Sequence, residues 1–468
     1  MLGTMMSGQK MPLFFKRAFQ AGSIATRAAS TATGSQSLSA GADDVVFIDA
    51  VRTPFLQSNG MYREMMSVDI QRHAILALLE RVKIPVTDIG HIACGTVVQE
   101  CRTSNVAREA ALTGGLPDSI PCSTVSLACI SSSLSSYNVA SMIRDGTCEA
   151  AIAGGVELLS DYPIRYHKKV RTALIDLQKA KTIGQKAKLA STIFKYILTP
   201  DLPGVTEYTT NETMGASADR LAAAFAVSRK EQDEYAIYSH TNAAKAAEAG
   251  KLSDIAPIYV NTDTKKGFIS ADNGIRVSTM EQLAKLKPAF IKPYGTITAA
   301  NASFLTDGAS AALYTSQAYA KRVGLKPKAY VRFIRFVAQD PKDELLLSPA
   351  YVIPQILDRF GLSLKDIDVF EIHEAFAGQV LANLKALDSD YFCQKKMLRK
   401  TKVGELPVAK MNTWGGSLSL GHPFGATGVR LVAHAANRLV SEGGRYAIIA
   451  ACAAGGHGVG MLLEAYPQ

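Results

Sequence analysis

Four side chains that could do nucleophilic or acid–base chemistry lie in unusual local sequences. Cys129 stands directly before a run of serines, where a helix is expected to begin. His422 lies in the glycine-rich stretch 412–428, Cys452 follows an apolar run that turns into small residues, and His373 follows another apolar run. When a thiol and an imidazole meet, the imidazole can take the thiol proton and create a nucleophile. These positions therefore favour an enzyme of the Cys–His type.

Each of the four residues also has an ordinary structural explanation. Free cysteine is among the most buried residue types, although the start of a helix would lower the pKa of the Cys129 thiol. The small residues after Cys452 could form a simple turn at the end of a strand. They also leave backbone N–H groups accessible, so those groups could bind an oxyanion. His373 could be a satisfied polar residue. His422 could be a structural loop histidine, but a base is favoured, because the surrounding glycines permit a tight loop that presents the ring. These glycines could also cradle a phosphate, but their spacing matches neither the dinucleotide nor the phosphate-loop fingerprint.

An internal repeat indicates which elements position these residues. The segment 77–95 resembles 355–373, and 131–155 resembles 425–456. Each pair reads as helices and strands in the same order, so two related α/β halves are expected, each with a mostly parallel sheet. Residues of about 160–295 have no counterpart and are predicted to be an insertion. Strand ends converge in such folds, so we expect the four reactive side chains to meet at the junction of the halves.

Composition limits the class of protein. The chain has 468 residues, 47% hydrophobic and 20% charged, with a formal net charge of +10. Residues 1–42 hold four Lys or Arg and no acid, which is typical of a mitochondrial transit peptide and leaves 10 − 4 = +6 for the remainder. No uncharged apolar run is long enough to span a membrane, and clustered basic and aromatic positions expected of a nucleic-acid partner are missing from the sequence. Seven cysteines without CxxC pairs argue against disulfides and a structural metal site.

The insertion contains a strongly basic segment. Residues 165–195 hold nine Lys or Arg and a single acid, Asp176, with apolar residues interleaved. This pattern predicts a basic amphipathic helix or hairpin. The segment could be a solvated helix pair that covers the core, or it could dock on anionic lipid or on a partner subunit. The lysines that would make such a contact are Lys179, Lys181, Lys186 and Lys188.

Six motifs in order resemble those of the thiolase family, from residue 45 to residue 463. They are AVRTPF at 50–55, Cys129 in its serine-rich setting, NASFLTDG at 301–308, HEAF at 373–376, GHP at 421–423 and CAAGG at 452–456. The resemblance implies a five-layer αβαβα fold of two similar halves with an inserted loop domain.

The resemblance also implies domain boundaries. After the transit peptide at 1–42, the first half covers 43–160 and is completed by about 296–318. The inserted loop domain covers 161–295 and carries the basic segment. The second half covers 319–468.

By the same resemblance, the chain is expected to cleave 3-ketoacyl-CoA with CoA as co-substrate and without a permanently bound cofactor. Cys129 would attack the ketone after His422 takes its proton, leaving an acyl-cysteine. Cys452 would protonate the departing acetyl-CoA carbanion and deprotonate the incoming CoA. One oxyanion would meet His422 and His373, and the other would meet the backbone N–H groups of Cys129 and Ala454.

Two departures from the usual motifs refine the resemblance. Many thiolases have Asn where this chain has His373, and glycine is usual at Ala454. The His form, the basic insertion and the leader resemble mitochondrial thiolases that work with an α-subunit carrying hydratase and dehydrogenase activities. This implies long-chain substrates in fatty-acid β-oxidation, a homodimer within a hetero-oligomer, and a matrix location with peripheral contact to anionic inner-membrane lipid.

Three other functions remain open at this point. One is a short-chain acetoacetyl-CoA thiolase, and another is a non-catalytic assembly or lipid-docking subunit. A decarboxylating ketoacyl synthase is disfavoured, because the second thiol at Cys452 has no use in that reaction.

Overall fold

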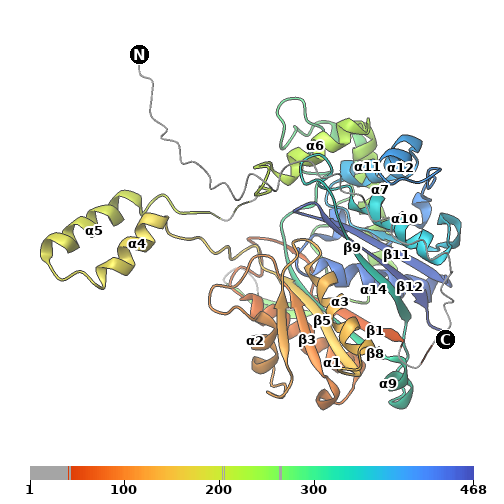
Figure 1. The fold of residues 1–468 in the computed structure, drawn as a ribbon, viewed down its shortest axis with the longest axis horizontal. Helices are drawn as coiled ribbons and strands as arrows, with labels where there is room; N and C mark the ends of the chain where they lie inside the picture. Colours follow the sequence, from red (N-terminus) through yellow and green to blue (C-terminus); the bar gives the residue numbers. More distant parts are fainter. Residues whose placement is uncertain (1–40, 42–43, 203, 205, 263–265, 468) are drawn as a thin grey trace, which may run out of the picture. The chain divides into compact units, whose positions relative to one another are not determined.

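The computed structural model describes residues 41, 44–202, 204, 206–262 and 266–467, all within one compact unit (Figure 1). Apart from Gly41, the predicted transit peptide lies outside the described residues. In this part of the chain the strands form a 10-stranded sheet and a separate two-stranded one, β6 with β7. The large sheet divides into two halves that meet where β1 pairs with β9.

The first half of the large sheet mixes parallel and antiparallel pairs. Strand β3 runs parallel to β4 and β5, whereas β8 runs antiparallel to β5, β1 and the short β2. Across the sheet the strands are β1 (Val45–Arg52), β8 (Thr306–Ser316) with β2 (Leu56–Gln57) beside it, β5 (Ala150–Glu157), β3 (His91–Gly95) and β4 (Cys122–Val125).

The second half is mixed in the same way. Strands β10 and β11 are parallel, while β12 is antiparallel to both β11 and β9. Its order is β9 (Ala329–Ala338), β12 (His457–Ala465), β11 (Tyr446–Ala453) and β10 (Val369–Ile372). The prediction of mostly parallel sheets is therefore wrong. Gly455 and Gly456 have φ of 82° and 70° and close a short hairpin between β11 and β12, which forces those strands antiparallel.

The helices complete five layers (Figure 1). Helices α1 and α2 cover the outer face of the first half-sheet, α10 and α11 lie on the outer side of the second, and α3 and α14 pack between the two. Three large hydrophobic clusters fill these interfaces, and the middle one joins α3 and α14 to both half-sheets. The bounds are α1 (Ser67–Val82), α2 (Val106–Thr113), α3 (Ser131–Arg144), α10 (Ser348–Phe360), α11 (Ala377–Leu387) and α14 (Thr427–Glu442). The expected αβαβα arrangement is present.

The two halves approach through backbone at the start of the central helices. A Cβ on Gly155, at the end of β5, would lie 1.9 Å from the carbonyl oxygen of Gly425. A Cβ on Gly428, in the first turn of α14, would lie 2.5 Å from the backbone nitrogen of Ser133 in α3. Only glycine leaves room for this contact. The glycines thus bring the loops before α3 and α14 together.

The segment between β5 and β8 holds the remaining long helices. Helices α6 and α7 pack on α11, and α7 also contacts the short α13. The bounds are α4 (Lys168–Leu177), α5 (Ile183–Tyr196), α6 (Met214–Ala224), α7 (Arg229–Glu248), β6 (Ile258–Asn261), β7 (Lys266–Ile269) and α8 (Met280–Ala284). Elsewhere lie α9 (Gln317–Arg322), α12 (Asp390–Lys395) and α13 (Ser417–Leu420), with 3-10 turns η2 (Val86–Asp88), η3 (Leu364–Asp366) and η4 (Val408–Lys410).

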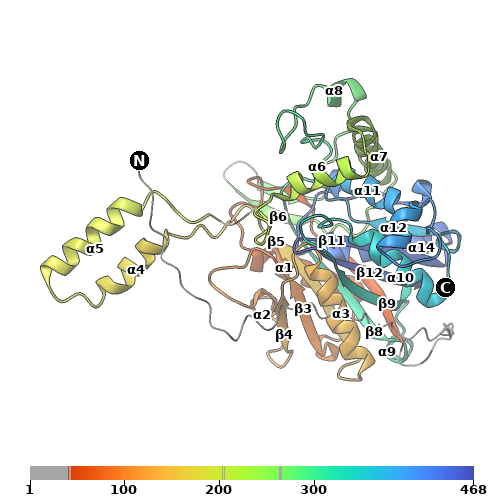
Figure 2. The ribbon, with the colours of Figure 1, turned by 45° about the horizontal axis from the view of Figure 1, so that its top comes forward.

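Helices α4 and α5 form a hairpin that projects from the rest of the fold (Figures 1 and 2). Helix α5 has no buried residue, and α4 buries only Val170 and Ala173. The interpretation of this basic segment as a cover for the core is therefore wrong. The lysines singled out in the sequence are all exposed: Lys179, Lys181, Lys186 and Lys188.

Candidate active site

Cys129 lies in a sharp turn between β4 and α3. The preceding residue, Ala128, has φ of 45°, a left-handed conformation that is uncommon outside glycine. The Ser131 hydroxyl donates to the carbonyl of Ala128 at 2.7 Å and accepts from the N–H of Leu127 at 2.8 Å, which fixes the turn. Cys129 itself is half-buried. The turn thus holds its sulfur just ahead of the first residue of α3.

The surroundings of Cys129 keep its thiol protonated. Burial raises its pKa to about 12, and the nearby Glu157 carboxylate adds to this. Two backbone N–H groups, those of Ala454 and Cys129 itself, lie within hydrogen-bonding reach of the sulfur and oppose the shift. The expectation that the helix start gives a net lowering of this pKa is wrong, because desolvation outweighs the N–H groups. The thiolate therefore needs a base to form.

Cys452 lies next to this thiol from the other half of the molecule. It is buried near the end of β11, and the turn that follows carries the Ala454 N–H to Cys129. Burial raises the pKa of Cys452, and charge on the neighbouring Cys129 raises it further. The two thiols are electrostatically coupled, so a thiolate on one disfavours a thiolate on the other.

His422 is held in a single orientation before α14. Its backbone N–H donates to the Thr306 hydroxyl at 2.9 Å, and its ring Nδ1 lies 2.7 Å from the Thr427 hydroxyl oxygen. That hydroxyl donates its own proton to the carbonyl of Pro423 at 2.9 Å, so it accepts from Nδ1–H. The proton of a neutral His422 ring is then on Nδ1. Its Nε2 lone pair is buried and has no hydrogen-bond partner among the described residues.

The charge state of His422 suits a base. Burial lowers its pKa well below the ordinary value of 6.5, and the neighbouring His373 and Arg430 lower it further. The imidazole is therefore neutral at neutral pH and can accept a proton at Nε2. This neutral state fits the base expected from the sequence, and the role of His422 stays a prediction.

His373 lies against His422, at the end of β10. The two ring centroids are 4.1 Å apart, and the Nε2 of His373 is also buried without a partner in the part of the chain that the structure describes. Its Nδ1 lies 3.0 Å from the Ser417 hydroxyl. Burial, aided by the Arg430 charge, lowers the pKa of His373 to about 3. Two neutral imidazoles thus meet, each with an unused Nε2.

The motif 301–308, for which the sequence suggested no role, ties the two histidine loops together. Its Ser303 N–H donates to the carbonyl of Ala375, its Asn301 carbonyl accepts from the N–H of Ala377, and its threonine binds the backbone of His422. Sequence reasoning also missed Ser417 and Thr427, which stand five residues on either side of His422 and bind the two rings. A serine and a threonine at these places carry no signal until the loops are folded.

Glu157 is another missed residue. Its buried carboxylate accepts from the backbone N–H groups of Val97, Val98 and Gly425, so it links β5 to the loop that presents His422. Burial raises the pKa of Glu157 to about 8 in spite of these donors.

The structure therefore brings Cys129, Cys452 and the Ala454 N–H together, and it places His373 against His422. Both groups lie where the loops before α3 and α14 meet, and the N–H of Val429 donates there to the Ser132 hydroxyl. The hairpin of α4 and α5, which carries the four predicted contact lysines, is a different part of the fold (Figure 1).

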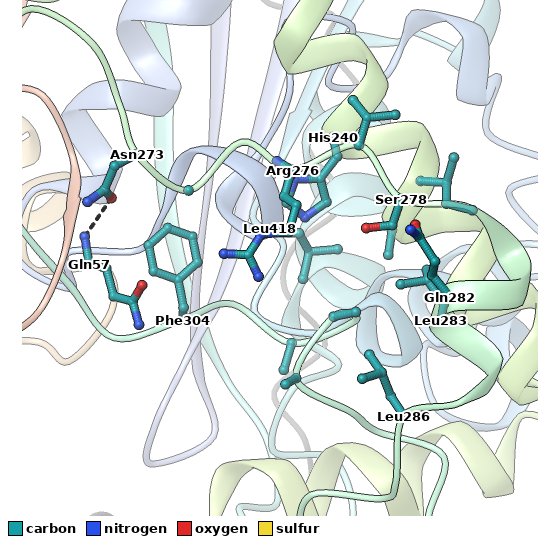
Figure 3. A pocket seen from close by; sticks show the side chains of 17 residues that line it. Gln57, His240, Asn273, Arg276, Ser278, Gln282, Leu283, Leu286, Phe304 and Leu418 are labelled. Atoms are coloured by element: carbon teal, nitrogen blue, oxygen red, sulfur yellow. Dashed lines mark hydrogen bonds between the residues drawn. The ribbon is translucent and has the colours of Figure 1, made fainter.

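A pocket of about 600 Å³ lies beside the histidine loops (Figure 3). Its wall includes Phe304 and Leu418, which belong to the segments that bind His422 and His373. Other residues that line the pocket come from α7, from α8 and from the loop before α8. They include His240 and Arg276. A small organic molecule fits a space of this size. Among the described residues, no cluster of His, Cys, Asp or Glu could hold a metal ion, and no helix is long and apolar enough to cross a membrane.

Fold and site together define a class. Residues 45–318 match the model of the thiolase N-terminal domain, and residues 325–465 match that of the thiolase C-terminal domain. The chain belongs to the thiolase family, so it is an acyltransferase, and both expectations are confirmed.

Individual relatives narrow this class. The chain is 61% identical over 423 residues to a probable 3-ketoacyl-CoA thiolase of Caenorhabditis elegans, covering 90% of this chain and 94% of the relative. It is 56% identical over 425 residues to the human mitochondrial trifunctional enzyme subunit beta, covering 91% and 89%. The crystal structure of human mitochondrial 3-ketoacyl-CoA thiolase in complex with CoA matches with a TM-score of 0.76 and 30% identity, covering 90% of this chain and 98% of that one. The expected resemblance to a mitochondrial subunit of this kind is confirmed.

Proposed function

We propose that this chain is a mitochondrial thiolase that cleaves long-chain 3-ketoacyl-CoA with CoA, in fatty-acid β-oxidation. The observation that carries the chemistry is the pair of neutral imidazoles, each with an unused buried Nε2, at the same loop junction as two coupled thiols. The named relatives support 3-ketoacyl-CoA as the substrate class.

The geometry suggests how the residues share the first half-reaction. The Nε2 lone pair of His422 takes the Cys129 proton, and the thiolate attacks the ketone carbon. When the carbon–carbon bond breaks, its electron pair leaves with acetyl-CoA and takes a proton from the Cys452 thiol. The high pKa of that thiol makes it a proton donor at neutral pH and a competent base once it is a thiolate.

In the second half-reaction the Cys452 thiolate takes the proton of incoming CoA. The CoA thiolate attacks the acyl-Cys129 thioester, and Cys129 leaves and is reprotonated from His422. The backbone N–H groups of Cys129 and Ala454 lie within hydrogen-bonding reach of the Cys129 sulfur. The oxyanion of the thioester would form next to that sulfur, so the same two N–H groups could bind it. The oxyanion of the ketone would meet His373 together with the imidazolium of His422.

We further propose that CoA enters through the 600 Å³ pocket. Arg276 supplies a cation on its lining, and apolar residues such as Leu283 and Leu286 suit the uncharged part of the molecule (Figure 3). CoA carries phosphates that a guanidinium binds well. We expect Arg276→Ala to raise the KM for CoA with little change in kcat, which steady-state kinetics measures.

The projecting hairpin supports a contact outside the catalytic fold. Ile183, Phe194 and Leu198 are 87, 82 and 90% exposed, next to the exposed lysines. Apolar side chains between cations are typical of peripheral binding to anionic lipid. We propose that this hairpin contacts the inner-membrane surface, and that the chain works as a homodimer within a complex with a hydratase and dehydrogenase α-subunit in the matrix.

A thiolysis assay tests the proposed function. Purified protein is given free CoA and 3-ketoacyl-CoA of increasing acyl length, with and without the α-subunit. We expect kcat/KM to rise with chain length. Activity confined to acetoacetyl-CoA would instead favour the short-chain thiolase, and no turnover at any length would favour a non-catalytic subunit.

A further inference from the structure

Ser417 connects His373 to a buried cation. Its hydroxyl oxygen lies 3.0 Å from Nδ1 of His373 and 2.8 Å from a terminal nitrogen of Arg430, and all three residues are almost completely buried. Ser417 is the first residue of the short helix α13, one position after the N-cap residue Gly416, so its hydroxyl does not stand in the capping position. Helix capping therefore does not explain why the Ser417 hydroxyl bonds to His373 and Arg430.

The hydrogen bonds between Arg430, Ser417 and His373 fix where the proton of the His373 ring lies. A guanidinium only donates hydrogen bonds, so the Ser417 oxygen accepts from Arg430. The hydroxyl has one proton of its own, and the only acceptor that it contacts in the described part of the chain is Nδ1 of His373. Nδ1 therefore accepts. In a neutral imidazole the ring proton is then on Nε2, which makes Nε2–H a donor.

His422 carries the opposite tautomer. Its Nδ1 donates to Thr427, so its Nε2 has the lone pair. The two rings, with centroids 4.1 Å apart, thus offer one base and one donor through chemically identical atoms. This difference comes entirely from the hydroxyl behind each ring.

We propose that Ser417, oriented by Arg430, is a positioning residue that fixes His373 as the Nε2–H tautomer and so makes it an oxyanion donor. This inference rests on the oxyanion role of His373 in the proposed function. Without the hydroxyl, the proton of His373 is free to move to Nδ1, and an Nε2 lone pair would then face the negative oxygen. Arg430 also disfavours a charged His373 ring, because its own charge lies close to it.

A double-mutant cycle tests the proposal by kinetics. We expect Ser417→Ala to lower kcat for thiolysis by about 5-fold with little change in KM, since one hydrogen bond of about 1 kcal/mol sets the tautomer. Ser419→Ala is the matched control, because Ser419 is a buried serine of the same helix whose bonds go to Ser239 and Gly416 instead of an imidazole. We expect it to change kcat by less than about 2-fold.

The second arm uses His373→Gln, whose amide carries an N–H without tautomers. If Ser417 acts through the tautomer, adding Ser417→Ala to His373→Gln leaves kcat unchanged. An equal loss in both backgrounds would mean that Ser417 acts through structure alone and would overturn the proposal.

The third arm does not depend on turnover. In the full-length wild-type protein with ¹⁵N-labelled histidine, protonated and bare ring nitrogens have well-separated shifts, and the His373 signals are assigned with His373→Gln. We expect Nε2 of His373 to be protonated and Nδ1 bare, and Ser417→Ala to mix the two forms. A protonated Nδ1 in the wild type would overturn the inference while leaving thiolase chemistry intact. Unchanged kcat in His373→Ala would instead refute the oxyanion role itself.

Discussion

At the scale of residues, burial decides the charge state of the site. Cys129 would be a better nucleophile with a low pKa, yet desolvation raises its pKa and lowers that of both imidazoles. The resting site therefore holds neutral groups. An ion pair forms only when a proton moves from sulfur to His422, which couples nucleophile formation to the reaction instead of leaving a reactive thiolate exposed to oxidation.

The buried His373 predicts a loss of stability in acid. Its pKa is about 3 in the folded state and about 6.5 when unfolded, so between these values the unfolded chain binds the extra proton. As pH falls below 6.5, unfolding is favoured by about 1.4 kcal/mol per pH unit for this residue. We expect His373→Gln to make the free energy of unfolding less dependent on pH in this window, as measured by denaturant titration.

Ser419→Ala is the control for that experiment, because it removes buried hydrogen bonds but no titrating group. An unchanged pH dependence in His373→Gln would contradict the assignment of a neutral buried ring.

A second residue-scale prediction separates the two thiols. Cys452→Ala removes the proton donor and base but leaves the nucleophile, so we expect acyl transfer to Cys129 to persist at a rate lower by about 100-fold. Rapid-quench measurement of the acyl-enzyme gives this rate. Complete loss of acylation in Cys452→Ala would mean that Cys452 is required before the acyl-enzyme forms.

The identities of the reacting residues could be predicted from the sequence, but their pKa values and ring tautomers could not. Cys129, His422 and Cys452 stand in motifs with distinctive glycines and small residues. Their pKa directions depend on burial by distant segments, and the ring tautomers depend on Ser417 and Thr427, whose contacts arise only when the loops meet.

At the scale of elements, glycines set the distance between the two central helices. Gly155 on β5 and Gly425 before α14 touch through backbone atoms, which cannot move aside as a flexible side chain would. The repeat in the sequence predicted the two halves and their central helices. It did not predict the antiparallel strands. An apolar strand looks the same in a sequence whether a three-residue hairpin loop or a helical crossover connects it to the next strand.

We expect Gly155→Ala to destabilise the protein by about 3 kcal/mol or more, because the new methyl would overlap the Gly425 carbonyl. The displaced loop carries His422, so activity should fall as well. Gly184→Ala in α5 is the control, since nothing lies within 4 Å of its added Cβ. It should stabilise slightly or have no effect. Thermal unfolding measures both, and equal melting temperatures would contradict the close contact.

At the scale of the whole molecule, the catalytic fold and the projecting hairpin differ in how much of their apolar surface is buried. Three hydrophobic clusters hold the five layers together, whereas the hairpin leaves large apolar side chains exposed among cations. Sequence composition predicted the basic amphipathic character of this segment. Its projection could not be predicted, because burial depends on what packs against a helix and not on its own pattern.

Charge reversal on the hairpin tests the proposed lipid contact. We expect Lys179, Lys181, Lys186 and Lys188 changed together to Glu to weaken binding to anionic vesicles by at least about 10-fold, since each basic residue contributes about 1 kcal/mol near such a surface. Thiolysis of soluble short substrates should be unchanged. A matched control changes four exposed lysines elsewhere, Lys266, Lys321, Lys326 and Lys365. Equal losses of vesicle binding in both proteins would refute a specific role of the hairpin.

The central claim is that Cys129 carries the acyl group. Intact-mass measurement of the wild-type protein after mixing with 3-ketoacyl-CoA, without free CoA, tests it directly, with peptide mapping to locate the adduct. We predict one acyl group, shorter than the substrate acyl chain by one acetyl unit, on Cys129, and no adduct on the Cys129→Ala protein. An acyl adduct on the Cys129→Ala protein, or one that maps to Cys452 in the wild type, would contradict the account.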